Sequence, residues 1–83
     1  MITVKILGSG CAKCTTLHQR LLNLKAEQGL AFDVIKVTDL REIMSYGIMA
    51  TPGLVVNEVV KSAGIMPDDR QILQWLTEAH HAA

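Results

Sequence analysis

A closely spaced pair of cysteines near the amino terminus constrains this chain more than any other feature. Cys11 and Cys14 are the only cysteines in its 83 residues. An apolar run over residues 2–7 precedes the pair, and a segment with helical periodicity follows it. The two thiols therefore stand at a strand-to-helix junction, within reach of each other. Such a pair can close a small disulfide ring or chelate a soft metal ion.

The two cysteines are expected to differ in reactivity. Cys11 falls at or next to the helix N-cap, where unpaired backbone N–H groups and the helix dipole stabilise a thiolate. Lys13 adds a cation close by. Cys14 lies one turn further along and is expected to be more buried. We therefore predict that Cys11 is a nucleophile and that Cys14 acts after it, the alternative being two inert structural cysteines.

Length and charge limit the classes of function. A chain of 83 residues predicts one small domain over 1–83, and eight basic residues balance eight acidic ones. This neutral balance predicts no nucleic-acid partner and no anionic membrane partner. No apolar run approaches the roughly 18 residues that a membrane span needs, and no secretory leader pattern is seen. A cytoplasmic location is the expectation, because a small secreted domain usually carries several disulfides.

The hydrophobic pattern predicts an α/β fold with the element order β-α-β-α-β-β-α. Strands are expected at 2–7, 31–37, 53–56 and 59–63, and helices at 13–28, 39–46 and 69–79. The second strand is apolar on both faces, as is typical of a strand inside a parallel sheet. Leu22 is expected to widen the apolar stripe of the first helix, and Leu40, Ile43 and Met44 to share one side of the second.

Two turns carry further information. Pro52 has no N–H to donate to a sheet, so it is expected at the start of a strand or at a sheet edge. Asn57 and Glu58 fit a two-residue hairpin turn, although glycine would suit the second position better than Glu58 does.

The histidines leave alternatives open. His18 lies one turn beyond Cys14, where it can be a base or ligand near the thiols or an ordinary surface histidine. His80 and His81 can bind a metal weakly, but we expect them to lie in a frayed and solvated tail.

Several residues together give this order a family resemblance. They are the Cys11-Ala12-Lys13-Cys14 motif after a strand, the run from Tyr46-Gly47-Ile48 through Thr51-Pro52 to Val56, Gly64, and Trp75-Leu76 in the closing helix. The chain resembles thioredoxin. More narrowly, it resembles small thioredoxin-like redox-active disulfide proteins, mini-thioredoxins of glutaredoxin size, over essentially its whole length.

The resemblance implies a four-stranded mixed sheet with flanking helices and a thiol-disulfide oxidoreductase that needs no cofactor. It also implies a cis peptide bond between Thr51 and Pro52 beside the cysteines, with an extended substrate backbone docked against Thr51. The implied partners are protein disulfides or dithiols and an electron donor like the flavin-dependent thioredoxin reductase, and the implied state is a monomer.

The chain also departs from the thioredoxin pattern. Gly10 replaces a tryptophan, Ala12-Lys13 replaces Gly-Pro, and the first strand lacks the buried acid of the family. These differences bear on redox potential, partner specificity and the route of deprotonation.

Two other functions remain open at this stage. A metallochaperone-like domain can carry Cu(I) or Zn(II) on Cys11 and Cys14, and ferredoxin-like domains of that kind also begin with a strand, a Cys-X-X-Cys loop and a helix. Such domains close with a strand, whereas residues 69–79 predict a closing helix. A redox-responsive interaction module without turnover is the third possibility.

Overall fold

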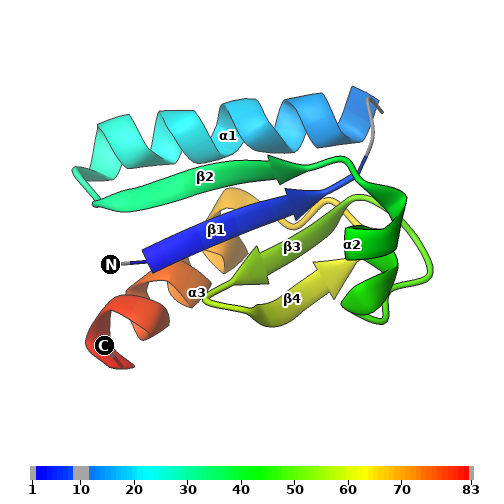
Figure 1. Ribbon diagram of the computed structural model, residues 1–83. Coiled ribbons are helices and arrows are strands. Elements are labelled where there is room, and N and C mark those ends of the chain that lie inside the picture. Colours follow the sequence, from blue (N-terminus) through cyan, green and yellow to red (C-terminus); the bar gives the residue numbers. More distant parts are fainter. Residues whose placement is uncertain (1, 9–11, 83) are drawn as a thin grey trace.

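The computed structural model describes residues 2–8 and 12–82. The elements are β1 (Ile2–Leu7), α1 (Ala12–Gln28), β2 (Phe32–Val37), α2 (Leu40–Ser45), β3 (Gly53–Val56), β4 (Val59–Ala63) and α3 (Asp69–Ala82), as Figure 1 shows. The predicted order β-α-β-α-β-β-α is confirmed, with boundaries at most a few residues from those expected.

The four strands form one mixed sheet in the order β2-β1-β3-β4. β1 runs parallel to β2 and antiparallel to β3, and β4 pairs antiparallel with β3. The prediction that β2 lies inside the sheet is wrong, because β2 is an edge strand and 45% of Ile35 is exposed. Apolar residues on both faces of a segment do not distinguish an interior strand from an edge strand whose outer residues are left uncovered.

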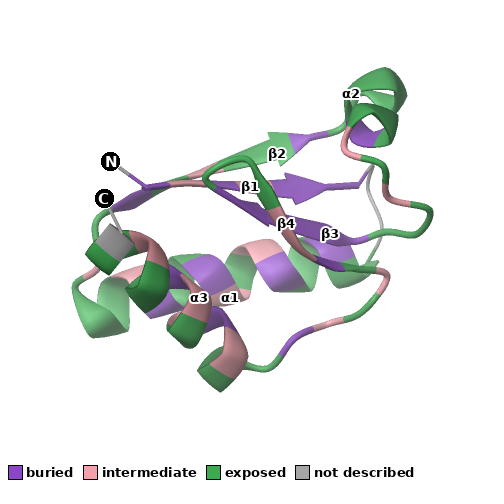
Figure 2. Cartoon of the chain, turned by 90° about the horizontal axis from the view of Figure 1, so that it is seen from below, coloured by how far each residue is buried: buried purple, intermediate pink, exposed green. Residues whose placement is uncertain are grey.

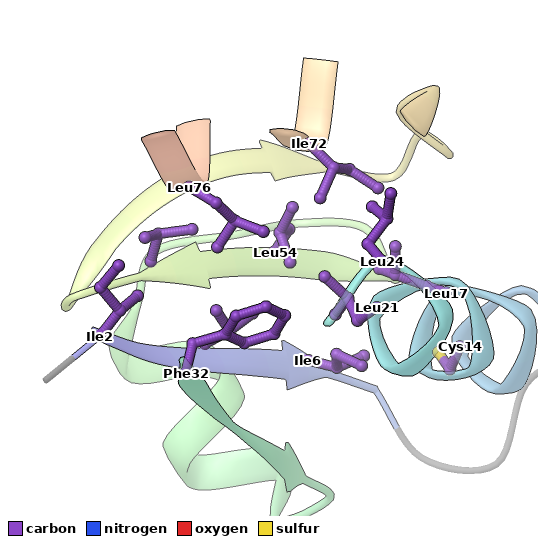
Figure 3. Packing of buried hydrophobic residues seen from close by; sticks show 12 residues of the cluster. Ile2, Ile6, Cys14, Leu17, Leu21, Leu24, Phe32, Leu54, Ile72 and Leu76 are labelled. Carbon is purple, nitrogen blue, oxygen red and sulfur yellow. The ribbon is translucent and has the colours of Figure 1, made fainter. Parts of the chain in front are cut away.

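Two helices cover one face of the sheet, and α2 lies on the other (Figure 2). The main core fills the space between α1, α3 and the sheet. Its fully or almost fully buried members include Val4, Ile6, Leu17, Leu21, Leu54, Ile72 and Leu76 (Figure 3). On α1, Cys14, Leu17, Leu21 and Leu24 form the predicted buried stripe. Leu22 does not widen it, because 39% of that residue is exposed.

The opposite face carries a smaller core beneath α2. Asp39 caps this helix, and its Oδ1 accepts hydrogen bonds from the backbone N–H groups of Arg41 (2.8 Å) and Glu42 (3.2 Å). Of the three apolar residues predicted to share one side of α2, only Ile43 is buried; Leu40 and Met44 are 69% and 64% exposed. With only six residues, the helix offers a single side chain to the sheet.

The hairpin between β3 and β4 turns at Asn57 and Glu58, which have positive φ angles of 49° and 67°. This confirms the predicted two-residue turn. The Asn57 side chain accepts a hydrogen bond from the backbone N–H of Thr3 at 2.9 Å. Glu58 stands where glycine is usual, and its carboxylate reaches Lys5 on β1, with 2.7 Å between Nζ and Oε1.

The last helix begins after Asp68, whose Oδ1 accepts a hydrogen bond from the N–H of Gln71 at 2.8 Å. It continues to Ala82, beyond the predicted end at residue 79. His80 and His81 are therefore exposed helical residues rather than a frayed tail, and their rings meet edge to face with centroids 6.0 Å apart. Within residues 2–8 and 12–82, no helix is long and apolar enough to cross a membrane.

Candidate active site

Gly8, at the carboxyl end of β1, lies at the centre of the candidate site. It is buried, and its N–H donates a hydrogen bond to the Val37 carbonyl at 3.0 Å, which fixes it beside the end of β2. A Cβ atom on Gly8 would overlap with Sγ of Cys14 and would lie 3.6 Å from Cβ of Thr51. The end of β1, the start of α1 and the distant Thr51 segment therefore meet at this glycine, and only a residue without a side chain fits between them.

Cys14 is the member of the cysteine pair that the structure describes. It lies in the first turn of α1, is 6% exposed and belongs to the main core (Figure 3). The expected burial of Cys14 is thus observed, while its comparison with Cys11 stays a prediction. Cys14 is disulfide-bonded in the structure. Cys11, for which we predicted the nucleophilic role, lies outside the described residues.

Lys13 is exposed in the first turn of α1, next to the buried Cys14. Its side chain is therefore free to extend into solvent near the helix start. His18 is half-buried further along the same helix. No interaction between His18 and the cysteine pair emerges from the described residues, so its proposed role as base or ligand gains no support.

The Thr51–Pro52 segment forms the opposite side of the site. The peptide bond between these residues is cis, and Pro52 is buried immediately before β3, at the strand start expected from the sequence. The N–H of Gly64 donates a hydrogen bond to the Pro52 carbonyl at 2.9 Å. Gly64 also packs closely on Ala50, since a Cβ on Gly64 would lie 2.7 Å from Cβ of Ala50. Thr51 itself is exposed.

Sequence reasoning missed the residues that surround Cys14 on the β2 side. A cavity of about 210 Å³ is lined by Ile6, Gly8, Cys14, Thr15, Lys36 and Thr38. Lys36 and Thr38 come from the end of β2 and the residue after it. The carboxyl ends of parallel strands share one edge of a sheet, so the pairing of β1 with β2 brings Lys36 to the start of α1. A cation there favours the charged form of a thiol.

A polar cluster fixes the far end of α2, from which the chain leads to Thr51. Lys5 Nζ donates to the Tyr46 hydroxyl at 2.9 Å, and that hydroxyl donates to the Glu58 carboxylate at 3.2 Å. Tyr46 is the C-cap of α2. The hydrogen bond between Lys5 and Glu58 lowers the pKa of the Glu58 carboxyl. The same Lys5–Glu58 bond is the largest cause that raises the pKa of Lys5, and the bond from Lys5 to the Tyr46 hydroxyl is the second. The cluster therefore holds its ion pair over the neutral pH range.

The structure brings no further ligands to support the metal-carrier hypothesis. Among residues 2–8 and 12–82, no group of three or more His, Cys, Asp or Glu side chains is placed to hold a metal ion. The described elements follow the order β-α-β-α-β-β-α, which differs from that of a ferredoxin-like carrier.

Comparison with known proteins agrees with this geometry. The model of the thioredoxin domain family matches residues 2–77. A thioredoxin of Methanocaldococcus jannaschii is 30% identical over 76 residues, covering 92% of this chain and 87% of that protein. A thioredoxin of Methanothermobacter thermautotrophicus is 29% identical, covering 93% of this chain and 100% of that one.

Solved structures show the same fold at low sequence identity. The oxidised thioredoxin of Plasmodium falciparum superposes with a TM-score of 0.65 at 16% identity, over 99% of this chain and 82% of that chain. A structure described as a malarial protein gives a TM-score of 0.69 at 12% identity, over 95% of this chain and 97% of that one.

A mixed four-stranded sheet flanked by helices, with a buried cysteine facing a proline loop, defines the thioredoxin-like class of protein. The family match extends over most of the chain, and the chain belongs to the thioredoxin family. The resemblance noted in the sequence is thereby confirmed. As a member of this family, the chain has the general chemistry of a thiol-disulfide oxidoreductase.

Proposed function

We propose that this chain exchanges disulfides with protein partners through Cys11 and Cys14. The observation that carries the proposal is the meeting of Cys14, Gly8 and Thr51. It places a buried, disulfide-bonded cysteine close to an exposed residue, Thr51, on which a substrate strand can lie. Thr51 and Pro52 are the proposed substrate-binding residues.

In the reducing direction, the Cys11 thiolate attacks one sulfur of the substrate disulfide. A mixed disulfide forms, and the first substrate sulfur leaves as a thiolate that takes up a proton. Cys14, once deprotonated, attacks the Cys11 sulfur and releases the second substrate thiolate. The substrate gains two electrons, and the Cys11–Cys14 pair becomes a disulfide. Lys13 and the helix N-terminus stabilise the Cys11 thiolate.

The cycle needs an external supply of electrons, because each turnover leaves the cysteine pair oxidised. We propose a donor similar to a flavin-dependent thioredoxin reductase. The balanced charge of the chain is the ground for proposing no nucleic-acid or anionic-membrane partner. The family resemblance is the ground for proposing a monomer, and the single closely spaced cysteine pair is the ground for proposing a cytoplasmic location.

Trapping the mixed disulfide tests this function. Cys14→Ser protein, reduced and mixed with a protein that contains a disulfide, is expected to accumulate a covalent complex that dithiothreitol releases. Cys11→Ser protein is the matched control, because it keeps one cysteine but lacks the nucleophile. Equal trapping by the two variants, or trapping only through Cys14, would contradict the assigned roles.

A further inference from the structure

A groove between β4 and α3 has no part in the chemistry proposed above. It consists of two cavities of about 370 and 340 Å³, and Lys61 and Trp75 line both of them. The first cavity reaches Glu78 on α3, and the second reaches Asp68 just before α3. We call this surface the β4–α3 groove. In the part of the chain that the structure describes, its lining includes none of the residues that meet at Gly8.

β4 forms one wall of the groove and is also an edge strand. In the described sheet it pairs with β3 alone, and it is the outermost strand in Figure 1. The outer side of β4 therefore carries backbone N–H and C=O groups that have no strand partner. The buried residues of α3, Ile72 and Leu76, pack with Leu54 in the main core, which leaves Trp75 beside β4. An extended segment of another protein can pair with an edge of this kind.

The charged side chains of the groove alternate in sign along it. Lys61 lies in the middle, since it lines both cavities, with Glu78 at one end and Asp68 at the other. None of these three residues takes part in the two ion pairs that the described chain contains. The order negative, positive, negative is complementary to a segment that carries a basic, an acidic and a basic residue in turn.

The spacing of these charges fits alternate residues of an extended segment. α3 runs alongside β4 in the opposite direction, because Glu78 shares a cavity with Val59, and Asp68 shares the other with Ile65. Asp68 and Glu78 are ten positions apart, which is about 15 Å at 1.5 Å per helical residue. Four steps along a strand span about 14 Å, and the first, third and fifth residues of a strand point to one face. One face of a five-residue segment can therefore reach Glu78, Lys61 and Asp68 together.

A second copy of this chain does not suit the groove. Two β4 strands paired antiparallel about Lys61 would place this lysine opposite its own copy, and like charges directly opposite each other are unfavourable. The pairing of β3 with β4 also shifts register between Leu54 and Val55, and such irregularities are common at edges that avoid pairing with themselves. The fitting occupant is a segment of a different protein that brings an acidic residue to Lys61.

We propose that the β4–α3 groove binds an extended segment of a partner protein, which adds a strand to β4. The segment carries a basic, an acidic and a basic residue at alternate positions, with β-branched residues between them. Its acidic side chain pairs with Lys61, and its basic side chains pair with Glu78 and Asp68. The apolar stems of the basic side chains cover the half-buried Trp75. This binding goes beyond disulfide exchange and does not require the cysteines.

Two peptides tested by NMR titration of the ¹⁵N-labelled protein distinguish the proposal from its alternatives. One is acetyl-Lys-Val-Glu-Val-Lys-amide, and the other, acetyl-Glu-Val-Lys-Val-Glu-amide, has every charge reversed. The amide signals of Val59–Ala63 and the indole N–H signal of Trp75, the only tryptophan, report on the groove. We expect the first peptide to shift these signals and to bind about tenfold more tightly than the second, as the loss of three exposed ion pairs predicts.

Two variants examine the charges of the groove. Asp68→Asn/Glu78→Gln removes the outer charges and is expected to lose the preference, while asparagine can still cap α3. Lys61→Glu is expected to weaken binding of the first peptide and to favour acetyl-Lys-Val-Lys-Val-Lys-amide instead. Asp33→Asn/Glu27→Gln removes two exposed carboxylates on β2 and α1; it is the matched control and is expected to keep the wild-type preference.

The outcomes separate this inference from the proposed function. Equal affinity for the first two peptides, shifts confined to signals away from β4 and Trp75, or no shift at all overturns the groove proposal and leaves disulfide exchange intact. Signals of β4 that change with protein concentration alone also overturn it, because a second copy then pairs with the edge. Cys11→Ser/Cys14→Ser protein cannot exchange disulfides and is expected to bind the first peptide as wild type does; loss of binding in this variant would place the peptide at the cysteine site and overturn the proposal.

Discussion

The backbone of Gly8 lies directly against the sulfur of Cys14, with no room for a side chain between them. This contact ties the end of β1 to the first turn of α1, and it explains why a glycine stands at this position. The sulfur is held from one side by the sheet and from the other by its own helix. The cysteine is therefore a fixed part of the core.

Gly8→Ala is expected to destabilise the reduced protein by about 1–3 kcal/mol, as overpacking of a filled core does. Urea unfolding measures the effect. In a Cys14→Ala background the sulfur is gone, so the same substitution is expected to cost much less; the pair forms a double-mutant cycle. An equal cost in both backgrounds would show that the Gly8–Cys14 contact is not the cause.

Lys36→Met is expected to slow the attack of Cys14 on the mixed disulfide. Lys36 lines the cavity beside Cys14, and a cation near a thiol favours the thiolate, so the variant is expected to have less Cys14 thiolate at pH 7. The release of the second substrate thiol is expected to fall by about threefold to tenfold at pH 7, since one pKa unit is a factor of ten. Single-turnover stopped flow across a pH series gives the rate.

The effect of Lys36→Met is expected to disappear at a pH above the thiol pKa in both proteins. Lys61→Met, on β4, is the control and is expected to behave like wild type. A loss of rate that persists unchanged at high pH would indicate a structural defect and would argue against an electrostatic role for Lys36.

Glu58→Gln is expected to lower stability at neutral pH but not in acid. The pKa of Glu58 is lowered in the folded protein, so the unfolded chain binds a proton more readily. The stabilisation by the Glu58 carboxylate is present above the ordinary carboxyl pKa of about 4.3. It is lost as the pH falls through the pKa that Glu58 has in the folded protein. Urea midpoints of wild type and Glu58→Gln should converge below about pH 4. A difference in urea midpoint that stays constant from pH 7 to pH 3 would show that the ion pair between Glu58 and Lys5 is not the source of the stabilisation.

Iodoacetamide is expected to modify Cys11 well before Cys14 in the reduced protein. Cys14 is 6% exposed, whereas Cys11 precedes the first residue of α1 in the sequence, where a thiolate gains from the helix dipole. The pH dependence of alkylation, read by mass spectrometry, is expected to give Cys11 a pKa below the free value of about 8.5. Faster modification of Cys14 would reverse the two assigned roles.

Much of the fold could be predicted from local patterns. The apolar stripe of α1, the Asp39 cap, the turn at Asn57 and the strand start after Pro52 each depend on neighbours in the sequence. Features that depend on tertiary arrangement were harder. The edge position of β2 and the exposure of Leu40 and Met44 follow from which surfaces remain uncovered, and composition does not record that.

Some residues of the candidate site could also be predicted from the sequence, and others could not. Cys14 and Thr51 could be named from the motif and the family resemblance. Lys36 could not, because only the parallel pairing of β1 with β2 brings the end of β2 to the start of α1. The ion pair between Glu58 and Lys5 could not be predicted either, because it joins the hairpin turn to β1.

Catalytic turnover tests the central claim most directly. Wild-type protein at one-hundredth of the concentration of a disulfide-containing protein, with dithiothreitol as reductant, is expected to reduce many substrate molecules per protein molecule. Cys14→Ser is expected to turn over more slowly than wild type, because dithiothreitol must resolve its mixed disulfide in place of Cys14, and Cys11→Ser is expected to match the uncatalysed rate. Wild-type protein that changes its own redox state but never exceeds the uncatalysed rate would contradict the oxidoreductase assignment and favour a redox-responsive interaction module.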